Sequence, residues 1–293
     1  MEEKKIKDQL NHFYTNEVDL FLERLISVKT QPNEKTIHEL RVEIKKLRSV
    51  FQLLDVIAKK EINIKQCANS LNDLFDTAGK IREIQVNQIC FTKFKFPQEI
   101  NDKYKKFLLN RENELGNRLK KTINHFDRLV LINSKKQIKK LTGDLNNKNM
   151  WDACLFYLKD KTLKIKNLLL AGNNTLIIHK IRIQLKSIHT IASFLQKIDP
   201  SQKNEKTLQL IKQTGTLIGN WHDNLVLINS LERYFIKKEN VPENKLPLLL
   251  RSINKIELEN KLILRTAKVK LKKVVISMNK NKFTSPTMAT SLK

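Results

Sequence analysis

The stretch His38-Glu39-Leu40-Arg41-Val42-Glu43-Ile44-Lys45-Lys46-Leu47-Arg48 decides how this chain folds, because its apolar residues recur every three or four positions. On a helix that advances about 100° per residue, these apolar residues share one face. Beside that face, within an arc of about 80° and with no carboxylate among them, lie four basic or titratable residues, His38, Arg41, Lys45 and Arg48. The stretch therefore predicts a helix with a buried face and a narrow cationic row next to it.

The same pattern returns 141 residues later, as His179-Lys180-Ile181-Arg182-Ile183-Gln184-Leu185-Lys186-Ser187-Ile188-His189. A second pair of similar segments, Gly79-Lys80-Ile81-Arg82-Glu83 and Gly219-Asn220-Trp221-His222-Asp223, is separated by 140 residues. Two matches at nearly one offset indicate an internal duplication, with halves 1–146 and 147–293. We expect an all-α fold over 1–293, in which two pseudo-twofold-related antiparallel four-helix bundles form one compact helical domain.

Prolines and clusters of Asn and Gly divide the remainder of the chain, which has only 6 glycines and 6 prolines in 293 residues. Between these breaks the apolar residues keep helical spacing, and no strand candidate competes with them. The pattern predicts helices over 5–30, 34–59, 61–94, 98–142, 148–171, 175–198, 202–238 and 244–280. The spans 98–142 and 244–280 are long enough to bend or break.

The charge balance points to an anionic partner. Lys and Arg number 56 against 30 Asp and Glu, which gives a net charge of +26 and a pI near 9.9. The 3 cysteines form no metal or disulfide motif, the N-terminus lacks the apolar core of a signal peptide, and no stretch reaches the roughly 18 apolar residues of a membrane span. We therefore expect a cytoplasmic protein without a membrane partner.

The two cationic rows suit a chain of phosphates better than a single nucleotide. Like charges three or four residues apart on a helix repel each other, so a row without acidic neighbours calls for an external anion. Arginine offers a planar fork to two phosphate oxygens, lysine a mobile charge, and histidine a donor whose charge changes near neutral pH. The sequence has no GxxxxGK[ST] phosphate loop. We therefore expect both rows to face one groove that binds an extended polyanion.

Several further basic residues are candidates for the same surface. Next to the rows are Lys46 and the two residues of the Gly-containing segments, Arg82 and His222. More remote are four residues on the predicted helices 98–142 and 244–280, namely Arg118, Arg251, Lys255 and Arg265. For the helix 244–280 a simply solvated basic face is the competing interpretation, because Glu257 and Glu259 lie on it as well.

These residues resemble the signature of the CHAD family, the conserved-histidine α-helical domains. The helix at 38–48 is similar to the family's signature helix, and the segments that begin at Gly79 and Gly219 are similar to its glycine-Arg/His-acid element. The resemblance implies two antiparallel four-helix bundles around a basic central channel, and binding of inorganic polyphosphate at polyphosphate granules. It implies that the ligand contacts are His38, Arg41, Lys45, Arg48, His179, Arg182 and Lys186. Ser187 and His189 depart from the basic residues that the family usually has there.

Three classes of function remain open at this point. The first is non-catalytic polyphosphate binding, and the second is nucleic-acid binding, which the net charge favours and the scarcity of aromatic residues disfavours. The third is an enzyme that acts on phosphoanhydrides, for which Glu83 and Asp223 are the acidic candidates. Each of these carboxylates follows a basic residue, so an orienting ion pair is the simpler interpretation. We expect no catalytic residue, no metal and no cofactor, because no HExxH motif or carboxylate cluster accompanies the histidines.

Overall fold

A computed structural model describes residues 5–58, 64–172, 174–200, 204–238 and 240–280, and every regular element within these ranges is a helix. The first part of the chain forms α1 (Lys5–Thr30), α2 (Glu34–Ile57), α3 (Ile64–Ser70), α4 (Asn72–Phe91), α5 (Gln98–His125) and α6 (Leu129–Asp144). The second part forms α7 (Asn147–Ala171), α8 (Thr175–Ile198), α9 (Glu205–Leu231) and α10 (Leu246–Lys280). A π-helical turn, η1 (Glu232–Ile236), continues α9, and a 3₁₀ turn, η2 (Glu243–Lys245), precedes α10.

The predicted helices agree with the observed ones except in two places. The span 61–94 is two helices, α3 and α4, that meet at the buried Leu71. Just before the break, the Ser70 hydroxyl donates a hydrogen bond to the carbonyl of Cys67, and such a local bond competes with the backbone bonds of a continuing helix. The span 98–142 is α5 and α6, because Phe126 adopts an extended conformation and packs on Phe21 while Asp127 accepts a hydrogen bond from the Leu129 amide. The helix predicted over 244–280 is continuous from Leu246.

Asparagine side chains fix where three of the helices begin. The Asn33 side chain accepts a hydrogen bond from the Thr36 amide at the start of α2, and Asn174 accepts one from the Ile177 amide at the start of α8. Asn146 does the same for α7. An Asn cap satisfies amides that a helix leaves unpaired, and contributes about 1 kcal/mol. Since Asn33 and Asn174 stand at equivalent places in the two copies of the sequence pattern, α2 and α8 start in the same register.

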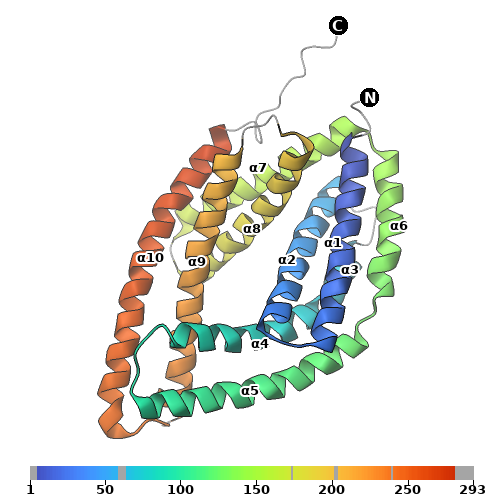
Figure 1. Ribbon diagram of the computed structural model, residues 1–293. Coiled ribbons are helices and arrows are strands. Elements are labelled where there is room, and N and C mark those ends of the chain that lie inside the picture. Colours follow the sequence, from blue (N-terminus) through green and yellow to red (C-terminus); the bar gives the residue numbers. More distant parts are fainter. Residues whose placement is uncertain (1–4, 59–63, 173, 201–203, 239, 281–293) are drawn as a thin grey trace.

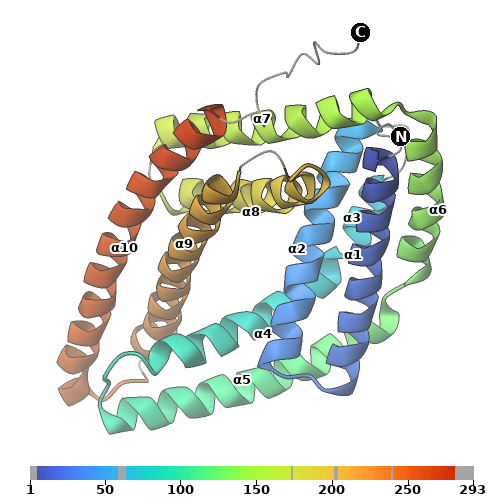
Figure 2. The same ribbon diagram turned by 45° about the horizontal axis from the view of Figure 1, so that its top comes forward.

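Four helices form an inner ring, and the remaining long helices lie outside it (Figures 1 and 2). In this ring α2 packs against α4, α4 against α9, α9 against α8, and α8 against α2. Outside it, α1 packs on α2, α5 on α4, α7 on α8 and α10 on α9. Each of the four sequence segments that carry the duplicated patterns therefore lies on a helix of the inner ring.

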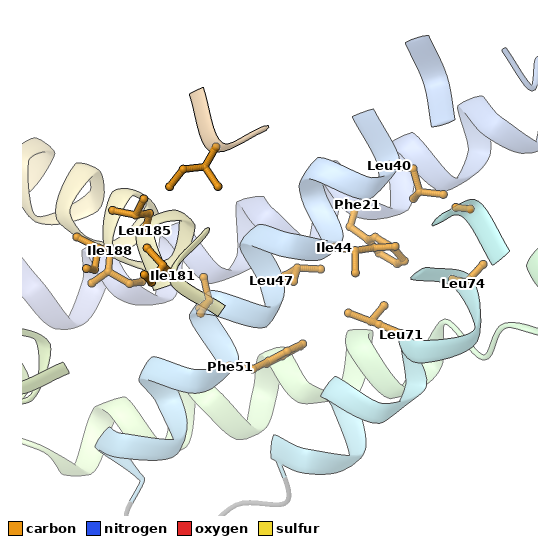
Figure 3. Close-up of a cluster of buried hydrophobic side chains, with 14 of the residues drawn as sticks. Phe21, Leu40, Ile44, Leu47, Phe51, Leu71, Leu74, Ile181, Leu185 and Ile188 are labelled. Atoms are coloured by element: carbon orange, nitrogen blue, oxygen red, sulfur yellow. The ribbon is translucent and has the colours of Figure 1, made fainter. Parts of the chain in front are cut away.

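The apolar faces of α2 and α8 are buried in one core (Figure 3). Leu40, Ile44 and Leu47 of α2 are fully buried, as are Ile181 and Ile188 of α8. Burial of such side chains contributes roughly 1.5–3 kcal/mol each. Where the two helices meet, the hydroxyls of Ser49 and Ser187 lie 3.3 Å apart in the interior. The packing thus fixes the position of each cationic row relative to the other. Among the described residues, no helix is sufficiently long and apolar to span a membrane.

Candidate anion-binding site

The cationic rows of α2 and α8 come together inside the inner ring. Lys186 on α8 lowers the pKa of Lys45 on α2 by repulsion, and Arg41 and Arg182 add to this effect. His38 is repelled by Lys186 across the same interface, and His179 by Lys45. Two rows that are 141 residues apart in the sequence therefore form one cluster, called here the cationic cluster, of His38, Arg41, Lys45, Arg48, His179, Arg182 and Lys186.

Burial and mutual repulsion weaken the charge of the lysines in the cationic cluster. The pKa of Lys45 falls from 10.5 to about 6, first because the amine is desolvated and then because Lys186, Arg41 and Arg182 repel its positive form. The pKa of Lys186 falls to about 8 for the same reasons, although donation of a hydrogen bond to Lys45 partly opposes the fall. Lys45 therefore loses its proton more readily than Lys186, and a nearby anion would favour the protonated form of both amines.

Arg41 is held by α4. Its guanidinium donates a 2.5 Å hydrogen bond to the carbonyl of Phe75 and lies 4.4 Å from the centre of the Phe75 ring. Arg48 stacks on the same ring at 4.0 Å and donates to the Asn72 side chain at 2.7 Å. Gly79 provides the space, because a Cβ at that position would lie 2.4 Å from the Arg41 guanidinium. The glycine of the repeated segment thus admits the arginine of the repeated row.

The second copy has the same contact in a looser form. A Cβ at Gly219 of α9 would lie 3.7 Å from the Arg182 guanidinium, which is ordinary contact. The position equivalent to Phe75 is Gly215, where an added Cβ would meet nothing within 4 Å. Within the described ranges, no aromatic ring is stacked on Arg182 as Phe75 is on Arg41.

Arg82 and His222 bring the Gly-containing segments to the same cluster. Arg82 of α4 lowers the pKa of His38 and of Arg41 by repulsion, and forms an ion pair with Glu34 at 3.0 Å. The His222 ring meets the His179 ring edge-on, with centroids 5.2 Å apart. All of these histidines have lowered pKa values, mainly through burial and next through neighbouring cations, so they are neutral at pH 7.

The cationic cluster lacks close anionic partners of its own. Within the described ranges, no carboxylate lies within 4 Å of the charged groups of Arg41, Lys45, Arg48, Arg182 or Lys186. Asp76 and Asp223 act on the arginines only from a greater distance. In addition, the buried Nε atoms of Arg41 and Arg182 have no hydrogen-bond partner in this part of the chain. A buried charged donor without a partner is costly, and the same donor is unpaired in both copies.

The structure separates six of the predicted site residues from the cationic cluster. Lys46 points to the opposite side of α2, where its amine pairs with Glu43 at 3.0 Å and Glu17 at 3.6 Å. It departs from the row because adjacent residues on a helix point about 100° apart. His189 follows the row along α8, but its pKa reflects burial and Lys212 of α9. Arg118 on α5 forms an ion pair with Glu114 at 3.0 Å. Three of the predicted residues are exposed on α10: Arg251, Lys255 and Arg265.

Phe75 and Asp76 belong to the surroundings of the cationic cluster and were not predicted from the sequence. Phe75 is four residues before Gly79 and so lies on the same face of α4, which is a signal that could have identified it. The described residues include no group of three or more His, Cys, Asp or Glu side chains that could hold a metal ion. The arrangement presents several positively charged groups to one region between α2 and α8.

Fold and site together define an all-helical protein with a half-buried cluster of basic side chains between two of its helices. The family model for the CHAD domain matches residues 14–232, and the chain belongs to this family. Among solved structures, the crystal structure of the CHAD domain from the plant Ricinus communis is similar, with a TM-score of 0.68, and the match covers 94% of this chain and 92% of that one. The sequence identity is 13%, so this likeness concerns the fold. A comparison with curated proteins finds no match.

Proposed function

We propose that this protein binds inorganic polyphosphate, without catalysis, at the cationic cluster between α2 and α8. The observation that carries the proposal is the convergence of two cationic rows that have no carboxylate within 4 Å among the described residues. Membership of the CHAD family adds support, because polyphosphate binding is the role that the family resemblance implies. Binding would relieve the repulsion that lowers the pKa values of Lys45 and Lys186.

The binding would be multivalent. Each contact between a phosphate and an exposed cation contributes little in water, but rigid helices hold several cations against one polymer, and release of counterions adds to the driving force. The unpaired Nε donors of Arg41 and Arg182 supply two of the contacts, and Lys45 and Lys186 two more. Affinity should therefore rise with chain length until the polymer spans the cluster.

The proposal includes the arrangement of the chain and its location. Two four-helix halves, 1–146 and 147–293, related by a pseudo-twofold axis, would place the polymer in a basic channel between them, as the equivalent caps of α2 and α8 and the paired Gly–Arg contacts suggest. We infer that the protein acts in the cytoplasm at polyphosphate granules. Its three cysteines are buried and unpaired, which is compatible with a reducing compartment.

Retention of long-chain polyphosphate by the purified full chain at about 150 mM salt tests the proposal. The double variant Lys45→Glu with Lys186→Glu should lose at least 10-fold in affinity. The matched control is Lys255→Glu with Arg265→Glu on α10, which makes the same kind of basic-to-acidic replacement at two exposed positions. Unchanged affinity in the first variant, or equal loss in both, would contradict a site between α2 and α8.

Competition separates polyphosphate from nucleic acid. The net charge of +26 would attract any polyanion, so duplex and single-stranded nucleic acids are added at equal phosphate concentration. We expect them to displace polyphosphate only weakly, because the described cluster offers one aromatic ring, Phe75, and its face is already covered by Arg41 and Arg48. Release of orthophosphate from the polymer during the assay would instead indicate an enzyme.

A further inference from the structure

A pocket lies on a face of α4 that points away from the cationic cluster. It has a volume of about 300 Å³ and is lined by α4, α5 and the junction of α9 with η1. On α4, the lining residues Lys80, Glu83 and Asn87 point about 100–160° away from Arg82, which belongs to the cluster. The pocket is therefore distinct from the proposed polyphosphate site.

Asn87 is the feature of this pocket that the fold does not explain. Its side chain is 1% exposed, and within the described part of the chain neither its amide nitrogen nor its amide oxygen has a hydrogen-bond partner. Buried amides are nearly always hydrogen-bonded, so the donor and the acceptor of this amide are both available to a polar group that enters the pocket. Asn87 lines the pocket beside the apolar side chains of Ile84, Phe107 and Leu115.

The rim of the pocket is cationic. Of its described lining residues, four are basic, Lys80, Arg111, Arg233 and Lys238, and one, Glu83, is acidic. Lys80, Arg233 and Lys238 are exposed, whereas Asn87 is buried, so the charges lie at the mouth and the amide at the floor. This order suits a molecule with an uncharged polar head and a phosphorylated tail.

The π-helical turn η1 contributes to this rim. The amide of Lys237 donates to the carbonyl of Glu232, five residues earlier, at 2.9 Å. Because a turn that is closed over five residues advances less per residue than an α-helical turn, Lys238 rather than Lys237 comes to line the pocket with Ser230 and Tyr234. Such turns within helices occur frequently at functional sites.

We propose that this pocket binds a nucleotide, with the base at the Asn87 amide and the phosphates at Lys80, Arg233 and Lys238. An asparagine amide matches the donor and acceptor edge of adenine, and the apolar side chains beside it suit a flat ring. Entry of the base requires a side-chain movement that uncovers Asn87. The proposal does not rest on polyphosphate binding, because it uses none of the residues of the cationic cluster.

Calorimetric titration with ATP, ADP, AMP and inorganic triphosphate tests the proposal, and it uses the full chain carrying Lys45→Glu and Lys186→Glu, so that phosphate groups cannot bind at the proposed polyphosphate site. We expect the adenine nucleotides to bind, and triphosphate to bind at least 10-fold more weakly. Asn87→Leu should abolish nucleotide binding and raise the melting temperature, because leucine removes the unpaired amide from the interior. Arg233→Glu with Lys238→Glu, both at exposed positions, should lose nucleotide affinity with an unchanged melting temperature.

Three outcomes would overturn the nucleotide site: no binding of any nucleotide, equal binding of triphosphate and ATP, or retained nucleotide binding in Asn87→Leu. A lower melting temperature of Asn87→Leu would show that the amide is satisfied within the fold. Polyphosphate retention provides the cross-check, because Asn87→Leu should keep it. Conversely, Lys45→Glu with Lys186→Glu should lose polyphosphate and keep the nucleotide, so that failure of one proposal is distinguishable from failure of the other.

Discussion

Replacing Lys45 by methionine should stabilise the unliganded protein while weakening its binding of polyphosphate. Lys45 is half-buried among Lys186, Arg41 and Arg182, and its pKa of about 6 means that folding removes a proton from it at neutral pH. Methionine keeps most of the apolar stem without the amine. The adjacent Lys46 provides a matched control, because it has the same side chain but pairs with Glu43 and Glu17.

The size of the effect follows from the pKa of Lys45. A lysine that has a pKa of 10.5 in the unfolded chain and about 6 in the folded one costs about 4 kcal/mol at pH 7.5. Methionine also removes the acceptor of the hydrogen bond from Lys186, which is worth about 1 kcal/mol. We therefore expect a net gain of about 3 kcal/mol in the free energy of unfolding, or roughly 6 °C or more in melting temperature.

Lys46→Met should have the opposite effect. Glu17 and Glu43 are both 8% exposed, and burial already raises the pKa of Glu17 to about 7. Lys46→Met leaves both carboxylates without a cationic partner, and we expect the free energy of unfolding to fall by about 1–2 kcal/mol. The loss is smaller than for a fully buried pair because Lys46 is partly exposed. Polyphosphate affinity should remain, since Lys46 faces away from the cationic cluster.

Urea unfolding of the three proteins at pH 7.5 and 9.5 measures these differences. Because the unfolded chain binds more protons than the folded one between pH 6 and 10.5, the wild type should gain stability as pH rises in this window. The advantage of Lys45→Met should therefore shrink by about 1.4 kcal/mol per pH unit. A variant no more stable than the wild type at pH 7.5, or an advantage independent of pH, would refute the placement of Lys45.

The affinity of the wild type for polyphosphate should fall as pH rises from 6 to 8, because binding restores the proton on Lys45. Calorimetric titrations in buffers with different ionisation enthalpies should show that binding takes up protons, and Lys45→Met should take up fewer protons than the wild type. Gly79→Ala should lower both the melting temperature and the affinity for polyphosphate, because its Cβ meets the Arg41 guanidinium. The control Gly116→Ala on α5 should stabilise the protein by about 0.5–1 kcal/mol, because nothing lies within 4 Å of the added Cβ. Equal effects of the two variants in thermal unfolding would contradict the placement of Arg41. Phe75→Leu should weaken polyphosphate binding several-fold in a retention assay, because it removes the ring on which Arg41 and Arg48 stack while their hydrogen bonds remain. Unchanged affinity would remove the ring from the site.

Much of the fold could be predicted because helical periodicity is a local property. The span of α2 and the register of α8 follow from apolar spacing and from the Asn33 and Asn174 caps. The length of the span 98–142 indicated that it could break, but neither the place of that break, Phe126, nor the break at Leu71 was predictable in this way, since both residues are apolar. Tertiary contacts decide them: Leu71 is fully buried, and Phe126 packs on Phe21 from a distant helix.

The sequence predicted two cationic rows that face one groove, but not how closely the two rows approach each other. The sequence identifies Arg41 and Arg182 by their helical spacing, and the duplication shows that they are equivalent. It does not contain the distance between α2 and α8, on which the lowered pKa values of Lys45 and Lys186 depend. Arg118 and Arg265 were predicted to bind the polyanion from their charge alone, and this stays a prediction. The structure places both at exposed positions outside the cluster.

The electrostatic cost of the cationic cluster connects the stability of this protein to the proposed binding of a polyanion. Two helices hold Lys45 and Lys186 together because the apolar faces behind them are buried in one core, so the packing opposes a repulsion that water would otherwise relieve. An anion that binds between the rows relieves the same repulsion, and the free energy released appears as affinity. A cluster with paired carboxylates would be more stable, but its anion would first have to displace them. The absence of close carboxylates around the described row is thus what a reversible polyanion site requires.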